Sequence, residues 1–191
     1  MSISNIDLQR YHRLNSTALQ SSTVFFGSDC FANIPVGELS QDLGSDTLVY
    51  NRSLTHLTVS DAADASEECI YPLHPSRLFI NLGETDLTAP DFSLEKFIAS
   101  YEWFLYTLNS RLKGSAQIYI VSVLSSHPLT HAVNDALIKL SDDTGCTYVD
   151  ITRAASAANI EVCIFQTLRH FFRRKRINLT EAFQIAQHSS I

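Results

Sequence analysis

The chain has 191 residues, a hydrophobic content of 45% and a net charge of -6. This length and apolar content fit one compact domain with a sizeable core and leave little room for a second domain. No apolar run approaches the roughly 20 residues of a membrane-spanning helix, and the start of the chain lacks the layout of a secretory signal. We therefore expect a cytoplasmic protein.

Five short runs of apolar residues, rich in β-branched and aromatic side chains, predict β-strands. They cover residues 23–26, 47–50, 77–82, 117–124 and 146–149. Most of them are apolar nearly throughout, which is typical of strands that are covered on both faces.

Segments with helical periodicity lie between and after these runs. They cover residues 36–43, 94–112, 129–141, 160–172 and 180–187. Strands that alternate with helices predict a parallel sheet, because parallel neighbours need long crossover connections that are usually helical. We expect the α/β class with three α/β/α layers, a five-stranded parallel sheet and a flavodoxin-like architecture. Ligands of such folds bind beyond the carboxyl ends of the strands.

Three segments that follow predicted strands resemble motifs of the SGNH/GDSL ester hydrolases. They are VFFGSDCF at 24–31, VYNRSLTH at 49–56 and NLGETD at 81–86. The later residues 119–128, Asn134 and 147–150 are similar to that family's next strand, helix and strand. The resemblance covers about residues 23–155, and it implies the same fold over one domain of residues 1–191, with a C-terminal helical segment at 156–191.

The resemblance also implies that most of the catalytic set is substituted. Asp29 stands at the position of the nucleophilic serine, His56 at that of the oxyanion-hole glycine, and Thr85 at that of the asparagine. The closing Asp-x-x-His motif is not found, since Thr167 precedes His170 where aspartate belongs. An acyl-aspartate would be an anhydride, and a missing oxyanion donor costs about a hundred- to a thousandfold in rate. A pseudohydrolase that keeps a cleft for a small molecule or a partner is the leading interpretation.

Two alternatives use the same cleft. In the first, the chain is an active esterase or acylhydrolase in which Ser28 is the nucleophile and a histidine, His56, His127 or His170, is the base. In the second, carboxylates and an imidazole hold a divalent metal; the candidates are Asp29, His56, Glu84 and Asp86. Whether the chain is an enzyme thus stays open at this stage, and no cofactor or metal is assigned. The residues expected to line the cleft and contact a ligand are Gly27, Gly83, Asp86 and His127.

Five of the fourteen basic residues gather between positions 169 and 176. They are Arg169, Arg173, Arg174, Lys175 and Arg176. A solvated helix face is the simplest interpretation, and an anionic partner is the alternative, because such a cluster raises the local anion concentration. With a net negative chain we do not expect nucleic acid as the partner. A protein partner or a homo-oligomer, contacting the basic segment 169–176, remains open, as does a small-molecule or ester-like ligand.

Overall fold

The computed structural model describes residues 5–45 and 47–172. Within them, five parallel strands form one sheet in the order β2-β1-β3-β4-β5. The strands are β1 (Thr23–Gly27), β2 (Val49–Asn51), β3 (Arg77–Asn81), β4 (Gln117–Val121) and β5 (Thr147–Val149). The predicted fold class, a three-layer α/β/α arrangement around a five-stranded parallel sheet, is confirmed.

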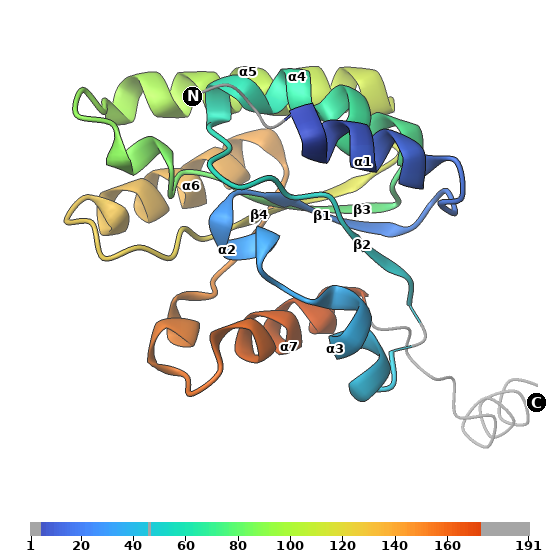
Figure 1. Cartoon of the computed structure of the whole chain (residues 1–191). Coiled ribbons are helices and arrows are strands. Elements are labelled where there is room, and N and C mark those ends of the chain that lie inside the picture. Colours follow the sequence, from blue (N-terminus) through green and yellow to red (C-terminus); the bar gives the residue numbers. More distant parts are fainter. Residues whose placement is uncertain (1–4, 46, 173–191) are drawn as a thin grey trace, which may run out of the picture.

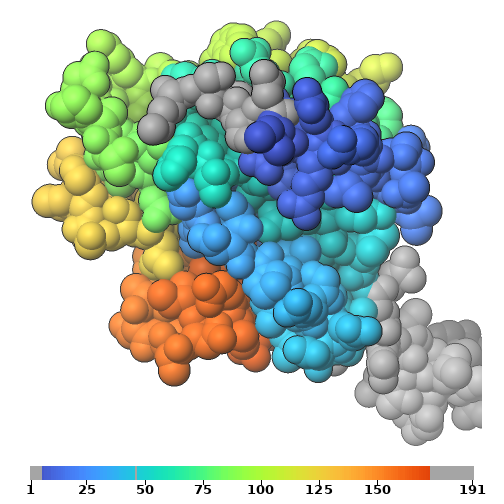
Figure 2. All heavy atoms as spheres, viewed as in Figure 1, coloured from blue at the N-terminus to red at the C-terminus, as the bar shows by residue number. Residues whose placement is uncertain are grey.

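Helices cover both faces of this sheet (Figure 1). On one face lie α1 (Asn5–Asn15), α4 (Val59–Cys69), α5 (Leu94–Leu112) and α6 (Thr130–Thr144). On the other face lie α2 (Asp29–Ala32), α3 (Val36–Asp42) and α7 (Ile160–Phe172). Figure 2 shows α3 and α7 side by side on the outside of that second face. Three short 3-10 helices, Tyr71–Leu73, Asp86–Thr88 and Thr152–Ser156, complete the described elements.

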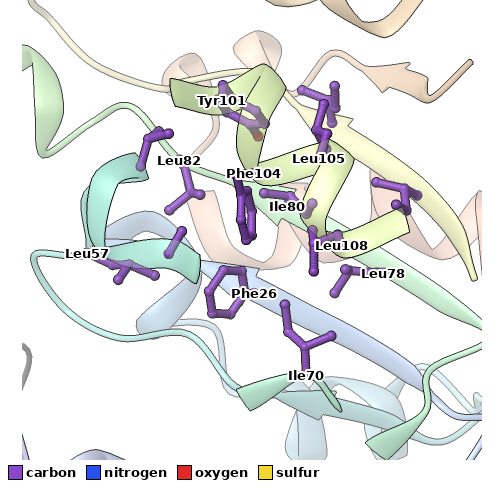
Figure 3. Close-up of a cluster of buried hydrophobic side chains, with 14 of the residues drawn as sticks. Phe26, Leu57, Ile70, Leu78, Ile80, Leu82, Tyr101, Phe104, Leu105 and Leu108 are labelled. Carbon is purple, nitrogen blue, oxygen red and sulfur yellow. The ribbon is translucent and has the colours of Figure 1, made fainter. Parts of the chain in front are cut away.

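Successive residues of each strand point to opposite faces, so the sheet divides the core into two clusters. Phe26 and Ile80 pack against Phe104 of α5 on the first face, as Figure 3 shows. Phe25 and Phe79 pack against aromatic residues of α7 on the second face. This double burial explains why the strands have apolar residues at nearly every position.

The helices α1, α2 and α4 have no counterpart among the predicted helices. The buried side of α4 consists of small side chains, which give a weak apolar signal: Ala62, Ala65, Ser66 and Cys69. The predicted helix at 160–172 is confirmed, whereas the predicted strand at 117–124 ends at Val121. Beyond that point the backbone leaves the ladder, and the Val123 amide donates to the Asn134 side chain at 2.8 Å. The predicted helix at 180–187 lies outside the described residues. No described helix is long and apolar enough to cross a membrane.

A buried arginine joins α1 to the end of β2. Arg52 is 5% exposed, and its guanidinium carbon lies 5.1 Å from the ring centroids of both Tyr11 and Tyr50. Its Nε donates to the Asn15 side chain at 3.3 Å, and the Tyr11 hydroxyl donates to the Ser53 carbonyl at 2.6 Å. These contacts fix the loop that leads from β2 toward the candidate site.

Candidate active site

The three loops that contain the segments 24–31, 49–56 and 81–86 meet at the carboxyl edge of the sheet. They follow β1, β2 and β3, which are neighbours, so their ends lie together. Gly27, at the end of β1, makes this convergence possible: a Cβ atom there would lie 2.3 Å from the Asn81 carbonyl oxygen of β3. Gly27 was expected to contact a ligand. Its surroundings instead explain why glycine is needed there: the backbones of β1 and β3 approach each other too closely for a side chain.

The carboxylate of Asp29 occupies the centre of the site. It accepts hydrogen bonds from the His56 backbone N-H, at 3.3 and 3.2 Å to its two oxygens. The Thr85 hydroxyl donates to it at 3.3 Å and the Ser28 hydroxyl at 3.1 Å. The side chain is 29% exposed. The carboxylate thus contacts a group from each of the three loops.

The positions of these donors bear directly on oxyanion binding. By the resemblance, His56 and Thr85 stand where the family supplies its oxyanion-hole glycine and asparagine. In this chain both donate instead to the carboxylate of Asp29. A developing oxyanion would have to compete with a fixed negative charge for the same donors, which opposes its stabilisation.

Ser28 lies beneath this carboxylate, away from solvent. It is 0% exposed, and its hydroxyl is 2.6 Å from that of Thr85. Within residues 5–45 and 47–172, no histidine nitrogen is hydrogen-bonded to the Ser28 oxygen. Ser28 therefore has no histidine base among these residues, and the basic group that its hydroxyl contacts is the Asp29 carboxylate, at 3.1 Å.

The backbone at His56 explains how a histidine replaces glycine there. His56 has a φ of 59°, the left-handed conformation that glycine adopts most easily. This conformation directs its N-H to Asp29, while the side chain is 67% exposed and its Nδ1 lies 3.5 Å from the carboxylate. Gly83 has a φ of 124°, and a Cβ there would lie 2.8 Å from the Val123 side chain. Gly83 therefore shapes the loop that carries Thr85.

Two further carboxylates flank Thr85 in the loop after β3. Glu84 accepts from the Cys30 backbone N-H at 3.1 Å, and Asp86 accepts from the Val59 N-H at 3.1 Å. Burial raises the pKa of Asp86 to about 6. Burial is also the main cause of the raised pKa of Glu84, and the negative charge of Asp29 adds to it. Burial, with Glu84 next, raises the pKa of the Cys30 thiol to about 12, so this thiol is a poor nucleophile.

The other two predicted histidines are not joined to this centre. His127 follows β4 at the same edge, but its Nδ1 accepts from the Leu129 amide and so stabilises its own turn. His170 is exposed near the end of α7. Two residues later, the Phe172 carbonyl accepts from the Thr47 hydroxyl, just before β2 begins. His170 is therefore at the amino edge of the sheet, opposite Asp29, which corrects its inclusion in the site.

A cavity of about 240 Å³ opens next to Thr85 and Asp86. Its walls come from the first turns of α4 and α5, including Ser60, Ser93 and Lys96. Ser60, Ser93 and Lys96 were not predicted as site residues, because α4 was not predicted and the segment 94–112 was interpreted only as a helix. Among the described residues, no three His, Cys, Asp or Glu side chains are grouped so that they could hold a metal ion. The four residues proposed as metal ligands therefore do not form such a group.

Comparisons with known proteins identify the fold. No family model and no curated protein matches this sequence. Solved structures do match. A candidate acylhydrolase from Bacteroides fragilis has a TM-score of 0.66 and 12% identity, and the match covers 84% of each chain.

Two other similar structures have names that state an activity. A GDSL-like lipase from Bacteroides thetaiotaomicron has a TM-score of 0.63 and 12% identity, with 81% of this chain and 82% of that chain covered. A catalytic mutant of an acetylxylan esterase from Geobacillus stearothermophilus has a TM-score of 0.61 and 15% identity, with 83% and 99% covered. Sequence identities this low show a shared fold and nothing more. This chain has an SGNH/GDSL hydrolase-like fold.

Proposed function

We propose that this protein is a non-catalytic member of its fold class, a pseudohydrolase that binds a small molecule in its cleft without hydrolysing it. The observation that carries the proposal is the position of the Asp29 carboxylate, which receives the His56 N-H and the Thr85 hydroxyl. A serine mechanism needs those donors free and a hydroxyl paired with a base.

Among the described residues, Ser28 is not hydrogen-bonded to a histidine, which supports the same proposal. Ser28, the alternative nucleophile, is fully buried and has hydroxyl and carboxylate partners. His56 lies next to the carboxylate of Asp29, and His170 lies at the far edge of the sheet. An esterase that uses Ser28 would need this centre to rearrange before reaction.

The negative charge of the site limits which ligands it can bind. Asp29, Glu84 and Asp86 bring three carboxyl groups to one edge, and none of them has an arginine or lysine partner among the described ion pairs. Small neutral or cationic molecules fit this environment better than anions do. The cavity beside Thr85 has hydroxyl groups, the carboxyl groups of Asp86 and Asp91 and the ammonium group of Lys96, so its charged side chains still carry one negative charge in excess.

Two assays test the absence of hydrolysis. The purified protein should show no labelling by a fluorophosphonate probe and no cleavage of a chromogenic acetate ester above background. The Asp29→Ser variant restores the family's hydroxyl close to His56, whose Nδ1 lies 3.5 Å from the Asp29 carboxylate. Hydrolysis by this variant but not by the wild type would show that the Asp29 carboxylate is what blocks the reaction. Hydrolysis by the wild type that disappears in Ser28→Ala would refute the proposal and support the esterase alternative.

A second measurement tests the cleft. Amide NMR shifts of Ser60 and Thr85 should respond to millimolar acetamide or ethanolamine and should not respond to acetate, which the carboxylates repel. The matched variant Asp86→Asn should weaken the response to ethanolamine more than that to acetamide. A response to acetate alone would contradict the expected ligand charge.

Location and assembly belong to the same proposal. We expect a cytoplasmic protein, which a fluorescent fusion can test. Most of the basic segment 169–176 lies outside the described residues, so its role as a partner contact stays a prediction. Size-exclusion chromatography of the wild type and of a variant with Arg173, Arg174, Lys175 and Arg176 changed to serine tests whether this segment mediates self-association.

A further inference from the structure

A cavity of about 350 Å³ lies at the amino edge of the sheet, at the opposite end of the strands from the candidate active site. β4 begins at Gln117 and β5 at Thr147, and both residues line the cavity. The other walls come from one stripe of α5, which includes Glu102, Leu105 and Tyr106, and from the turn between α6 and β5. The volume is within the usual range of sites for small molecules.

The inner wall of this cavity is apolar. Leu105 and Ile118 belong to the core cluster of the first face, and Cys146 packs against it. Leu105 extends from α5 toward that core (Figure 3). Tyr106 is 73% exposed, so its ring lies where the cavity meets the solvent. Burial raises the pKa of the Cys146 thiol, which therefore stays neutral and is a poor nucleophile. The wall thus offers apolar contact without a reactive group.

The charges around the cavity have one sign. Among the described residues, Glu102 is the only charged side chain that lines it, and none of the described ion pairs includes Glu102. The helix α6 ends here, and the last turn of a helix carries a partial negative charge. Basic side chains often compensate that charge. The last turn of α6 has no basic residue and instead contains Asp142 and Asp143, both exposed.

We propose that this cavity binds a small organic cation with an apolar body, such as an arylalkylamine. The apolar body contacts the wall formed by Leu105 and Ile118, and the ammonium group pairs with the Glu102 carboxylate beside the face of Tyr106. A metal ion fits less well, because a single carboxylate supplies too few oxygen ligands. The inference does not depend on whether the carboxyl-edge site is catalytic.

Amide NMR shifts of the full chain test this site. Three probes share a phenyl ring and differ in charge: phenethylamine is a cation, 2-phenylethanol is neutral and 3-phenylpropionate is an anion. The amides of Gly145 and Thr147, which line the cavity, should respond to phenethylamine with a dissociation constant of about 1 mM, a reasonable value for so small a ligand. The alcohol should bind more weakly, and the anion most weakly.

A pair of variants tests the role of the charge. Glu102→Gln removes the carboxylate and keeps the size of the side chain. It should weaken the binding of phenethylamine about two- to fivefold, as expected for an exposed ion pair, and leave that of 2-phenylethanol unchanged. The matched control is Glu95→Gln, which makes the same change of charge in the first turn of α5, at a residue that does not line the cavity. This control should bind all three probes as the wild type does.

Three results would overturn the proposal. Equal responses to the amine and to the anion would exclude charge selection, and an equal loss in both glutamate variants would mean that only the overall charge of the protein matters. Shifts of Ser60 and Thr85 without shifts of Gly145 and Thr147 would assign the amine to the carboxyl-edge cavity. Because the two pairs of amides report on opposite ends of the sheet, a failure here is distinguishable from a failure of the proposed function.

Discussion

Replacing Gly27 by alanine should destabilise the protein although it adds a single methyl group. The new Cβ would lie 2.3 Å from the Asn81 carbonyl oxygen and 3.1 Å from its carbon. These are backbone atoms inside the sheet, so they cannot rotate away as a side chain could. The strands β1 and β3 must part, which at typical costs of overpacking lowers the free energy of unfolding by about 1–3 kcal/mol. For a chain of this size that corresponds to a Tm about 2–12 °C lower.

The control for this variant is the same substitution at Gly37. Gly37 lies in α3 and a Cβ there meets nothing within 4 Å. Alanine should stabilise the helix by about 1 kcal/mol because glycine has the lower helix propensity. Thermal unfolding followed by circular dichroism measures both variants. A Gly27→Ala protein that is as stable as the wild type, or a Gly37→Ala protein that loses as much stability, would refute this reasoning.

Two further predictions concern the buried charged groups. Burial raises the pKa of Asp86 to about 6, above the value of about 3.9 in an unfolded chain, so its protonated form favours the folded state. This contribution to the free energy of unfolding is present below pH 4 and is lost as the pH rises to 6. The Asp86→Asn variant lacks it, so its stability in urea unfolding should fall less between pH 4 and pH 6 than that of the wild type. An equal fall in the free energy of unfolding of both proteins would contradict the raised pKa of Asp86. Arg52→Lys should lower the free energy of unfolding by about 1–2 kcal/mol because lysine cannot stack between Tyr11 and Tyr50. The exposed Arg10→Lys should cost nearly nothing, and equal losses would exclude stacking as the cause.

The meeting of the three loops at the candidate site could be predicted from the sequence. Asp29, His56 and Thr85 were aligned with three family positions from motif order and spacing, and their loops do meet at one edge of the sheet. The reason is topological: parallel strands direct their carboxyl ends to the same edge, so residues that follow neighbouring strands converge. His170 was misplaced because distance along the sequence does not reveal at which end of a helix a residue meets the sheet.

The orientation of side chains required the tertiary structure. The sequence indicated that an acidic residue stands at the nucleophile position, but the hydrogen bonds of its carboxylate join residues 27 and 56 positions away along the chain. The burial of Ser28 likewise depends on Thr85 and its loop. Contacts of this kind are long-range, and they are fixed by how strands order themselves and how loops pack.

The sequence by itself determined the five strands, the helices α3, α5, α6 and α7 and the α/β class, because these follow from local periodicity and from the need to bury apolar side chains on both faces of a sheet. The tertiary structure decided that the Asp29 carboxylate takes the donors of the oxyanion position, that α4 covers the sheet with small residues, and that α7 ends beside β2. Those features depend on distances between residues that are remote in sequence, and no local pattern encodes them.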